Sequence, residues 1–254
     1  IGDYFTWRVA YFVGGGLGFA LFALRLGTYE STMFKTMLTH TGIRRGDFFQ
    51  LFTNRKRALR YLNCIMVGLP IWFSIGILIV LSPEFSREIG VQGSVKAGTA
   101  IMFAYIGLSI GDFSSGLFSQ LLKSRKKVII GFQLLLLLLC AVYLFNHHVS
   151  VTYFKIMCLL LGFAAGYWAI FVTNAAEQFG TNIRSVVTNT VPNFVRGAVW
   201  PLSELFKSML PDEDPISGII KASVTIAAAV FTVAFIASYF TEETYGKDLN
   251  YTEE

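Results

Sequence analysis

One stretch of the sequence, residues 184–209, combines an apolar composition with side chains that could bind a charged ligand. Its polar and large aromatic side chains at helical spacing are Asn189, Asn193, Arg196, Trp200, Glu204 and Lys207. They recur with the 3.6-residue period that puts side chains on one face of a helix. Arg196 lies near the middle of the stretch, where a membrane makes an unpaired cation cost at least about 2.5–3.5 kcal/mol.

Two interpretations of this polar stripe stay open. In the first, the stripe lines a substrate path and Arg196 binds an anionic group. In the second, the stripe forms a pairing network with polar groups on neighbouring helices. Both interpretations place the stripe against protein or a water-filled cavity. A charged side chain that faces lipid would cost too much free energy.

Three further apolar stretches, residues 62–82, 97–122 and 151–176, carry polar or aromatic side chains at depth. The candidates that they add to a substrate path are Trp72, Ser74, Tyr105, Trp168 and Asn174. Packing between helices is the alternative role for each of them. Asp112 also has two interpretations: it carries a coupling proton, or it pairs with a cation of the basic loop at residues 123–127.

The composition predicts that the chain lies in a membrane. Of its 254 residues, 54% are hydrophobic and 15% are charged, against about 25% charged residues in an average soluble domain. Too few polar residues remain to cover a soluble fold, and the same deficit excludes a disordered chain. Seven apolar stretches approach the roughly 20 residues that a helical span needs. They are residues 5–24, 62–82, 97–122, 128–145, 151–176, 184–209 and 216–240. We therefore expect an all-α membrane protein with seven transmembrane helices.

The distribution of charge predicts which ends of the spans face the cytoplasm. Most of the 21 lysines and arginines lie in residues 25–60 and 123–127, with Arg184 and Lys247 on the same side. The positive-inside rule makes this side cytoplasmic, with the N-terminus of the chain outside and the C-terminus inside. We expect an integral protein of the cell (inner or plasma) membrane. Nucleic acid is not an expected partner, because the cations alternate between loops and do not share one face.

No catalytic or cofactor motif accompanies the spans. The sequence has no nucleophile elbow, no zinc-binding helix motif and no phosphate-binding loop. We therefore expect no catalytic residues, no metal ligands and no cofactor, and a protein that is not an enzyme. Three glycine pairs at four-residue spacing, Gly14/Gly18, Gly107/Gly111 and Gly162/Gly166, predict close approach of helix backbones.

Four segments, in order along the chain, resemble landmarks of the major facilitator superfamily, in particular its sugar and metabolite porters. Residues 29–32 (Tyr-Glu-Ser-Thr) resemble the segment after the sixth helix of that fold. Residues 111–127, from Gly-Asp to the basic run, are similar to the loop between the eighth and ninth helices. Residues 177–184 resemble an E-x-F-P-T-x-x-R segment with glycine in place of proline, and residues 243–246 (Glu-Thr-Tyr-Gly) resemble a P-E-T-x-G tail.

The resemblance covers nearly the whole chain, from the sixth helix of a twelve-helix transporter to the twelfth. It implies the last helix of the N-terminal half at residues 1–24 and a basic cytoplasmic linker with an interfacial helix at 25–60. It implies a C-terminal six-helix half at 61–240 and a cytoplasmic tail at 241–254. It also implies a cytoplasmic charge network that holds one access state and breaks in the other. The members of this network would be Asp112, Arg125, Glu177 and Arg184.

The function expected from these features is secondary active transport of a small polar metabolite, such as a sugar or an organic acid, by alternating access. Proton coupling is left open. The substrate path would be lined near the midplane by Trp72, Ser74, Tyr105, Trp168, Asn174, Asn189, Asn193 and Arg196. The expected partners are the lipid bilayer, a small-molecule substrate and an N-terminal half of the same transporter, without which these residues should not transport.

The alternative from another class is a seven-helix receptor or photoreceptor. Seven spans with the N-terminus outside and the C-terminus inside fit that topology as well. Against a retinal protein, the last span carries no lysine except Lys221, which lies at its outer edge. A membrane enzyme is the third interpretation, and it would need an acid–base or metal cluster that the sequence does not offer.

Overall fold

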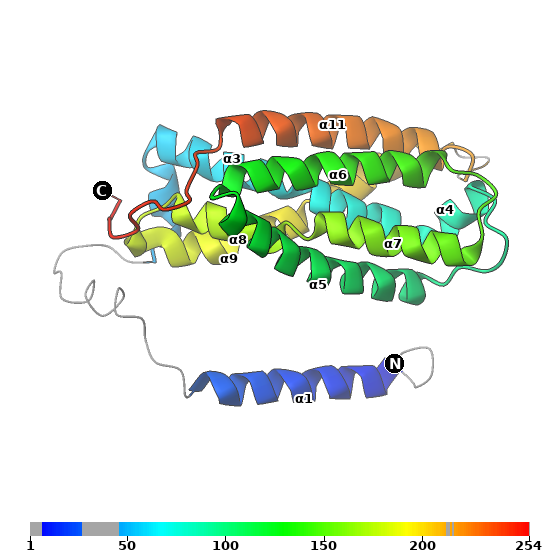
Figure 1. Ribbon diagram of the computed structural model, residues 1–254, viewed down its shortest axis with the longest axis horizontal. Helices are drawn as coiled ribbons and strands as arrows, with labels where there is room; N and C mark the ends of the chain where they lie inside the picture. Colours follow the sequence, from blue (N-terminus) through cyan, green and yellow to red (C-terminus); the bar gives the residue numbers. More distant parts are fainter. Residues whose placement is uncertain (1–6, 27–45, 212–213, 215, 254) are drawn as a thin grey trace. The chain divides into compact units, whose positions relative to one another are not determined.

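The computed structural model of the chain describes residues 7–26, 46–211, 214 and 216–253 (Figure 1). The chain divides into two compact units, Ile1–Ile43 and Arg44–Glu254. The described part of the first unit is a single, largely apolar helix, α1 (Trp7–Leu26). In the described part of the second unit every regular element is helical, apart from one isolated β-bridge between Gln92 and Ser150.

Six helical segments in the described ranges are long and apolar enough to cross a membrane. They are Trp7–Leu26, Arg55–Ile79, Ala97–Leu121, Arg125–Phe145, Val151–Glu177 and Ile219–Phe240. Their length and composition confirm the all-helical membrane class that the sequence predicts. The count of seven spans stays a prediction, because the remaining apolar stretch does not form one continuous helix.

That stretch, predicted as a span over 184–209, forms two helices that meet at Ala198. They are α9 (Thr181–Gly197) and α10 (Val199–Ser208). Pro201 gives the physical reason for the interruption. Proline has no N–H to donate to the carbonyl of Gly197 one turn earlier, and its ring crowds that carbonyl. Apolarity predicts where such a segment lies in the membrane, but it does not predict that the helix is regular.

The second unit is built around α3 (Arg55–Phe73), the most buried of its spans (Figure 1). Helix α11 (Ile219–Phe240) packs against α3 and against α6 (Arg125–Phe145). Helices α5 (Ala97–Leu121) and α7 (Val151–Ala165) pack closely against each other.

The shorter elements complete this unit. Helix α4 (Ser82–Glu88) follows α3, and α8 (Trp168–Glu177) continues the span of α7 after an interruption at Gly166 and Tyr167. Helix α9 packs against α3 and α8. Helix α8, which follows one interruption, therefore packs against α9, which precedes the other.

Helix α3 changes its winding after Pro70, and its last part, Ser74–Ile79, is a π-helix. Pro70 cannot donate to the carbonyl of Met66, so the regular ladder is interrupted there. Side chains from other helices bond to carbonyls of this region. The hydroxyl of Tyr167 and the amide of Gln133 both donate to the carbonyl oxygen of Val67, at 3.2 and 3.0 Å. Irregular backbone at membrane depth requires such internal partners.

Glycines allow α5 and α7 to touch backbone to backbone. A Cβ at Gly107 would overlap the carbonyl oxygen of Leu159, and a Cβ at Gly162 would overlap that of Ala104. Two of the three glycine pairs predicted from the sequence therefore meet across one helix interface, where small residues are needed. This contact fixes which residues of α5 lie beside the interruption between α7 and α8. A Cβ at Gly14 or Gly18 would meet no described atom within 4 Å.

The described part of the basic linker packs against the helices instead of forming a long separate helix. Residues Phe48–Phe52 form a short 3-10 turn, capped by Asp47, and Leu51 within it is fully buried. The spanning helix α3 begins soon afterwards, at Arg55. An interfacial helix was expected within residues 25–60. Residues 27–45 lie outside the described part of the chain.

The glycine contact between α5 and α7 gives the first prediction. Gly107→Ala should force the two backbones apart and destabilise the protein by about 1–3 kcal/mol, the usual cost of overpacking. The matched control is Gly116→Ala on the same helix, because a Cβ at Gly116 meets no atom within 4 Å. Thermal unfolding in detergent should show a lower Tm for Gly107→Ala alone. Equal Tm values for the two variants would contradict this packing.

Candidate functional site

Trp72, Trp168 and Arg196, three path candidates from three different helices, meet in one cluster. The guanidinium carbon of Arg196 lies 5.1 Å from the ring centre of Trp72 and 5.9 Å from that of Trp168. The two indole rings contact each other edge to face, with centres 6.0 Å apart. A guanidinium stacked on an aromatic face gains about 0.5–2 kcal/mol. The cluster therefore offsets part of the cost of a cation at this depth.

Each member of the cluster lies at a point where its helix departs from regular winding. Trp72 is the penultimate residue of α3, just before the π-helix. Trp168 is the first residue of α8, just after the interruption. Arg196 is the penultimate residue of α9, just before the junction with α10. Broken helices of this kind mark ligand sites in transporters, because the freed backbone groups line a cavity.

The cluster offers hydrogen-bond donors without matching acceptors. Arg196 is exposed, and among the described residues no carboxylate forms an ion pair with it. The indole Nε1 of Trp72 is buried and has no acceptor among the described residues. Unmet buried donors are uncommon in folded proteins, and this one lies beside the cation. A site of this composition suits a ligand that accepts hydrogen bonds or carries negative charge.

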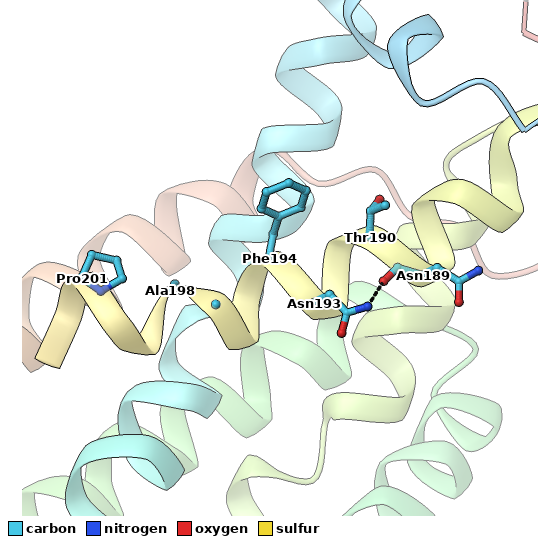
Figure 2. A pocket seen from close by; sticks show the side chains of 7 residues that line it. Asn189, Thr190, Asn193, Phe194, Ala198 and Pro201 are labelled. Atoms are coloured by element: carbon cyan, nitrogen blue, oxygen red, sulfur yellow. Dashed lines mark hydrogen bonds between the residues drawn. The ribbon is translucent and has the colours of Figure 1, made fainter.

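A cavity of about 620 Å³ adjoins the cluster along α9 and α10 (Figure 2). Its lining residues are Asn189, Thr190, Asn193, Phe194, Gly197, Ala198 and Pro201. None of the three cluster residues lines the cavity, but Arg196 directly precedes the lining residue Gly197 and lies one helical turn from Asn193 on α9. The volume lies within the range of about 300–1,000 Å³ that is typical of small-molecule sites.

The structure brings five of the eight path candidates to this region and leaves three elsewhere. Tyr105 is exposed on α5, away from the contacts described above. Ser74 is fully buried beside the thiol of Cys140 on α6. Asn174 is buried near the tail, where its amide donates to the Thr244 hydroxyl at 2.9 Å. Sequence depth alone does not distinguish these packing positions from lining positions.

Asp112 has a role that neither of its two sequence interpretations named. Its Oδ1 accepts a hydrogen bond from the backbone N–H of Ala169 at 2.9 Å, in the first turn of α8. One turn further along α5, the Ser115 hydroxyl donates to the carbonyl oxygen of Gly166 at 2.8 Å. These two side chains satisfy backbone groups that the interruption between α7 and α8 leaves open. Among the described residues no ion pair joins Asp112 to the basic loop.

Two of the four expected members of the cytoplasmic network form a partly buried ion pair. Arg125 donates to both carboxylate oxygens of Glu177, at 3.0 and 3.3 Å. Arg125 also donates to the Ser119 hydroxyl at 2.8 Å, and the Thr244 hydroxyl donates to Glu177 at 2.6 Å. The pair thus joins the start of α6 to the end of α8 and to the tail. Asp112 lies outside this network, in the cap described above.

Arg184 bonds to the tail and forms no ion pair with Glu177 among the described residues. Its guanidinium donates to the carbonyl oxygens of Leu249 and Phe179, at 2.7 and 3.1 Å. The tail ends in a second cluster that the sequence did not indicate. The Glu253 carboxylate accepts from Arg57 and Arg60 at 3.2 and 3.0 Å. The residues after α11 therefore fasten together the nearby ends of α3, α6, α8 and α9.

Glu243 anchors the first part of the tail to the loop before α6. Its carboxylate accepts from the Ser124 hydroxyl and from the backbone N–H groups of Arg125 and Tyr245. Burial alone would raise the pKa of Glu243, but these hydrogen bonds outweigh it and lower the pKa below its ordinary value. A lowered pKa means that the ionised carboxylate stabilises the attached tail, and this contribution is lost as the pH falls through the lowered pKa.

The capping role of Asp112 gives the second prediction. Asp112→Asn keeps an oxygen acceptor for Ala169 and should cost little stability. Asp112→Ala removes the acceptor and should cost about 1 kcal/mol, typical of a lost helix cap. Thermal unfolding of the two variants separates them. If Asp112 instead carried a proton in transport, Asn and Ala would abolish activity alike while the Tm of Asp112→Asn stayed near that of the native protein.

The anchoring role of Glu243 gives the third prediction. The mobility of a spin label at position 248 should be low at neutral pH and should rise as the pH falls below the ordinary carboxyl range, because protonated Glu243 loses its charge-assisted hydrogen bonds. Glu243→Gln should raise the mobility at neutral pH and flatten the acid transition. A label that responds to acid equally in both proteins would assign the transition to another carboxylate.

Protein-family models, curated proteins and solved structures were compared with the chain, and none of them matches it. The functional conclusion therefore depends on the residues and the geometry described above.

Proposed function

We propose that the chain is the second helical half of a secondary transporter, which moves a small polar metabolite by alternating access. The observation that carries the proposal is the convergence of three irregular helices on Trp72, Trp168 and Arg196. An interrupted helix at membrane depth costs stability unless other groups satisfy its backbone. Three such interruptions around one exposed cation are consistent with a ligand site and have no evident use in passive packing.

The unpartnered faces of the second unit support a missing half. Only 22% of the most apolar window of α5 is buried within the chain, against 61% for the window that includes α3. On α9 the buried residues recur every four positions, and the opposite face is polar and exposed. That polar face contains Ser185, Asn189, Asn193 and Arg196. Lipid does not accept such a face, so we infer that a second helical half covers it and leaves a path between the two.

The cytoplasmic contacts fit the role of a gate in this proposal. The Arg125–Glu177 pair and the tail join the cytoplasmic ends of α3, α6, α8 and α9 within the second unit. The resemblance to the major facilitator superfamily places a similar charge network at this position. The partly buried Arg125–Glu177 pair and its additional hydrogen bonds stabilise the conformation in which these helix ends are joined. A transporter must be able to break such contacts to reach its other conformation.

A cysteine at position 193 provides the fourth prediction, which needs no knowledge of the substrate. Asn193 lines the cavity and is exposed. The native cysteines of the chain, Cys64, Cys140 and Cys158, are all buried. In the full-length native protein, Asn193→Cys should react with a membrane-impermeant maleimide from either side of the membrane. Alternating access opens the same position to the two sides in turn.

Two control positions complete this experiment. Gln120→Cys lies at the exposed end of α5 next to the basic loop, and it should react from one side only. Ala104→Cys is fully buried in the α5–α7 contact and should not react from either side. Reaction of Asn193→Cys from one side only would contradict alternating access and favour a receptor-like bundle.

A further inference from the structure

One exposed face of α9 carries two different kinds of polar group, and its asparagines line the cavity. Arg196 supplies donors and positive charge at one end. Asn189 and Asn193 lie toward the other end, about 10 and 4.5 Å along the helix axis from Arg196 at the normal rise per residue. A ligand that meets both must combine two kinds of chemistry in one short molecule.

Both asparagines line the cavity, and their amide nitrogens are bonded within the helix. The Nδ2 of Asn193 donates to the carbonyl oxygen of Asn189 at 2.7 Å (Figure 2). The Nδ2 of Asn189 donates to the carbonyl oxygen of Ser185 at 2.8 Å. These bonds engage the amide nitrogens within the helix. No donor among the described residues reaches either Oδ1, so both remain free to accept hydrogen bonds from a ligand.

Apolar and aromatic surface completes the lining. Phe194, Ala198 and Pro201 border the cavity, and the Trp72 ring lies under the guanidinium of Arg196. Such surface packs against carbon–hydrogen faces but offers no carboxylate to an amine. Among the described residues no acidic side chain lines this cavity. The lining therefore offers nothing to a cationic ligand, and Arg196, which does not line the cavity itself, is the charged neighbour of Gly197 on the same helix.

We infer that the ligand of this site is a hydroxylated organic anion, of the class of sugar acids and hydroxycarboxylates. Its anionic group binds Arg196, and its hydroxyl groups donate to the Oδ1 atoms of Asn193 and Asn189. This inference rests on the proposed transport function and adds the class of its substrate. A neutral sugar would leave Arg196 unpaired, and a simple fatty acid would leave both amide oxygens unpaired.

Three six-carbon probes separate these contributions. Gluconate has both a carboxylate and hydroxyl groups, glucitol has the hydroxyl groups alone, and hexanoate has the carboxylate alone. Binding to the full-length native protein can be followed by tryptophan fluorescence, since Trp72 and Trp168 contact Arg196. Gluconate should bind with a Kd at least about tenfold lower than that of glucitol or hexanoate. It alone can bond to both Arg196 and the asparagine oxygens.

Variants assign each part of the ligand to its residue. Arg196→Gln should raise the Kd for gluconate at least about tenfold, toward that of glucitol, and leave glucitol binding unchanged. The double variant Asn189→Ala with Asn193→Ala should raise the Kd for gluconate about two- to tenfold and leave hexanoate binding unchanged. A second measurement avoids any folding defect of Arg196→Gln: gluconate, but not glucitol or hexanoate at equal concentration, should slow the alkylation of Asn193→Cys.

Several results would overturn the inference. They are glucitol or hexanoate binding as tightly as gluconate, an unchanged Kd for gluconate in correctly folded Arg196→Gln, and no saturable gluconate binding up to about 10 mM. Alkylation of Asn193→Cys from both sides of the membrane is measured without any ligand. If that two-sided reaction occurs and gluconate fails to bind, the substrate class is wrong and the transport proposal stands.

Discussion

The cost of placing a guanidinium inside an apolar helical bundle governs the arrangement around Arg196. Membrane depth makes an unpaired cation expensive, and the chain offers no described carboxylate to neutralise it. Two tryptophan rings stack against the guanidinium instead, and the exposed face of α9 keeps it accessible. Stacking of this kind stabilises a cation without occupying its hydrogen-bond donors. The guanidinium thus remains available to a ligand, which a structural salt bridge would prevent.

The same region concentrates the irregular backbone of the second unit, and side chains from other elements bond to two of its three interruptions. Side chains from α6 and from Tyr167 bond to the Val67 carbonyl of α3. Asp112 and Ser115 of α5 bond to the ends of the break between α7 and α8. The glycine contact between α5 and α7 brings these side chains within reach. Close packing, capping and the cluster around Arg196 are therefore connected, because Asp112 on α5 bonds to Ala169, the residue after Trp168.

The sequence predicted the parts of this arrangement that depend on one helix at a time. Apolar stretches located the helices, and helical spacing placed Asn189, Asn193 and Arg196 on one face. The sequence could not predict contacts that depend on a break in a distant helix. The cap made by Asp112 requires the first turn of α8 to lie beside α5, and no local pattern indicates where α8 begins. Glu253 was missed because an acidic residue in a polar tail has no periodicity, and only the fold brings it to Arg57 and Arg60.

The central claim is that Arg196 binds an anionic solute in a path that opens to each side of the membrane in turn. The most direct measurement is exchange of labelled gluconate in proteoliposomes that contain the full-length protein. An alternating-access carrier should take up labelled gluconate faster when the vesicles are preloaded with unlabelled gluconate, because the loaded site returns more readily than an empty one. Arg196→Gln should abolish this acceleration. Uptake that is indifferent to preloading, or acceleration that survives Arg196→Gln, would contradict the account.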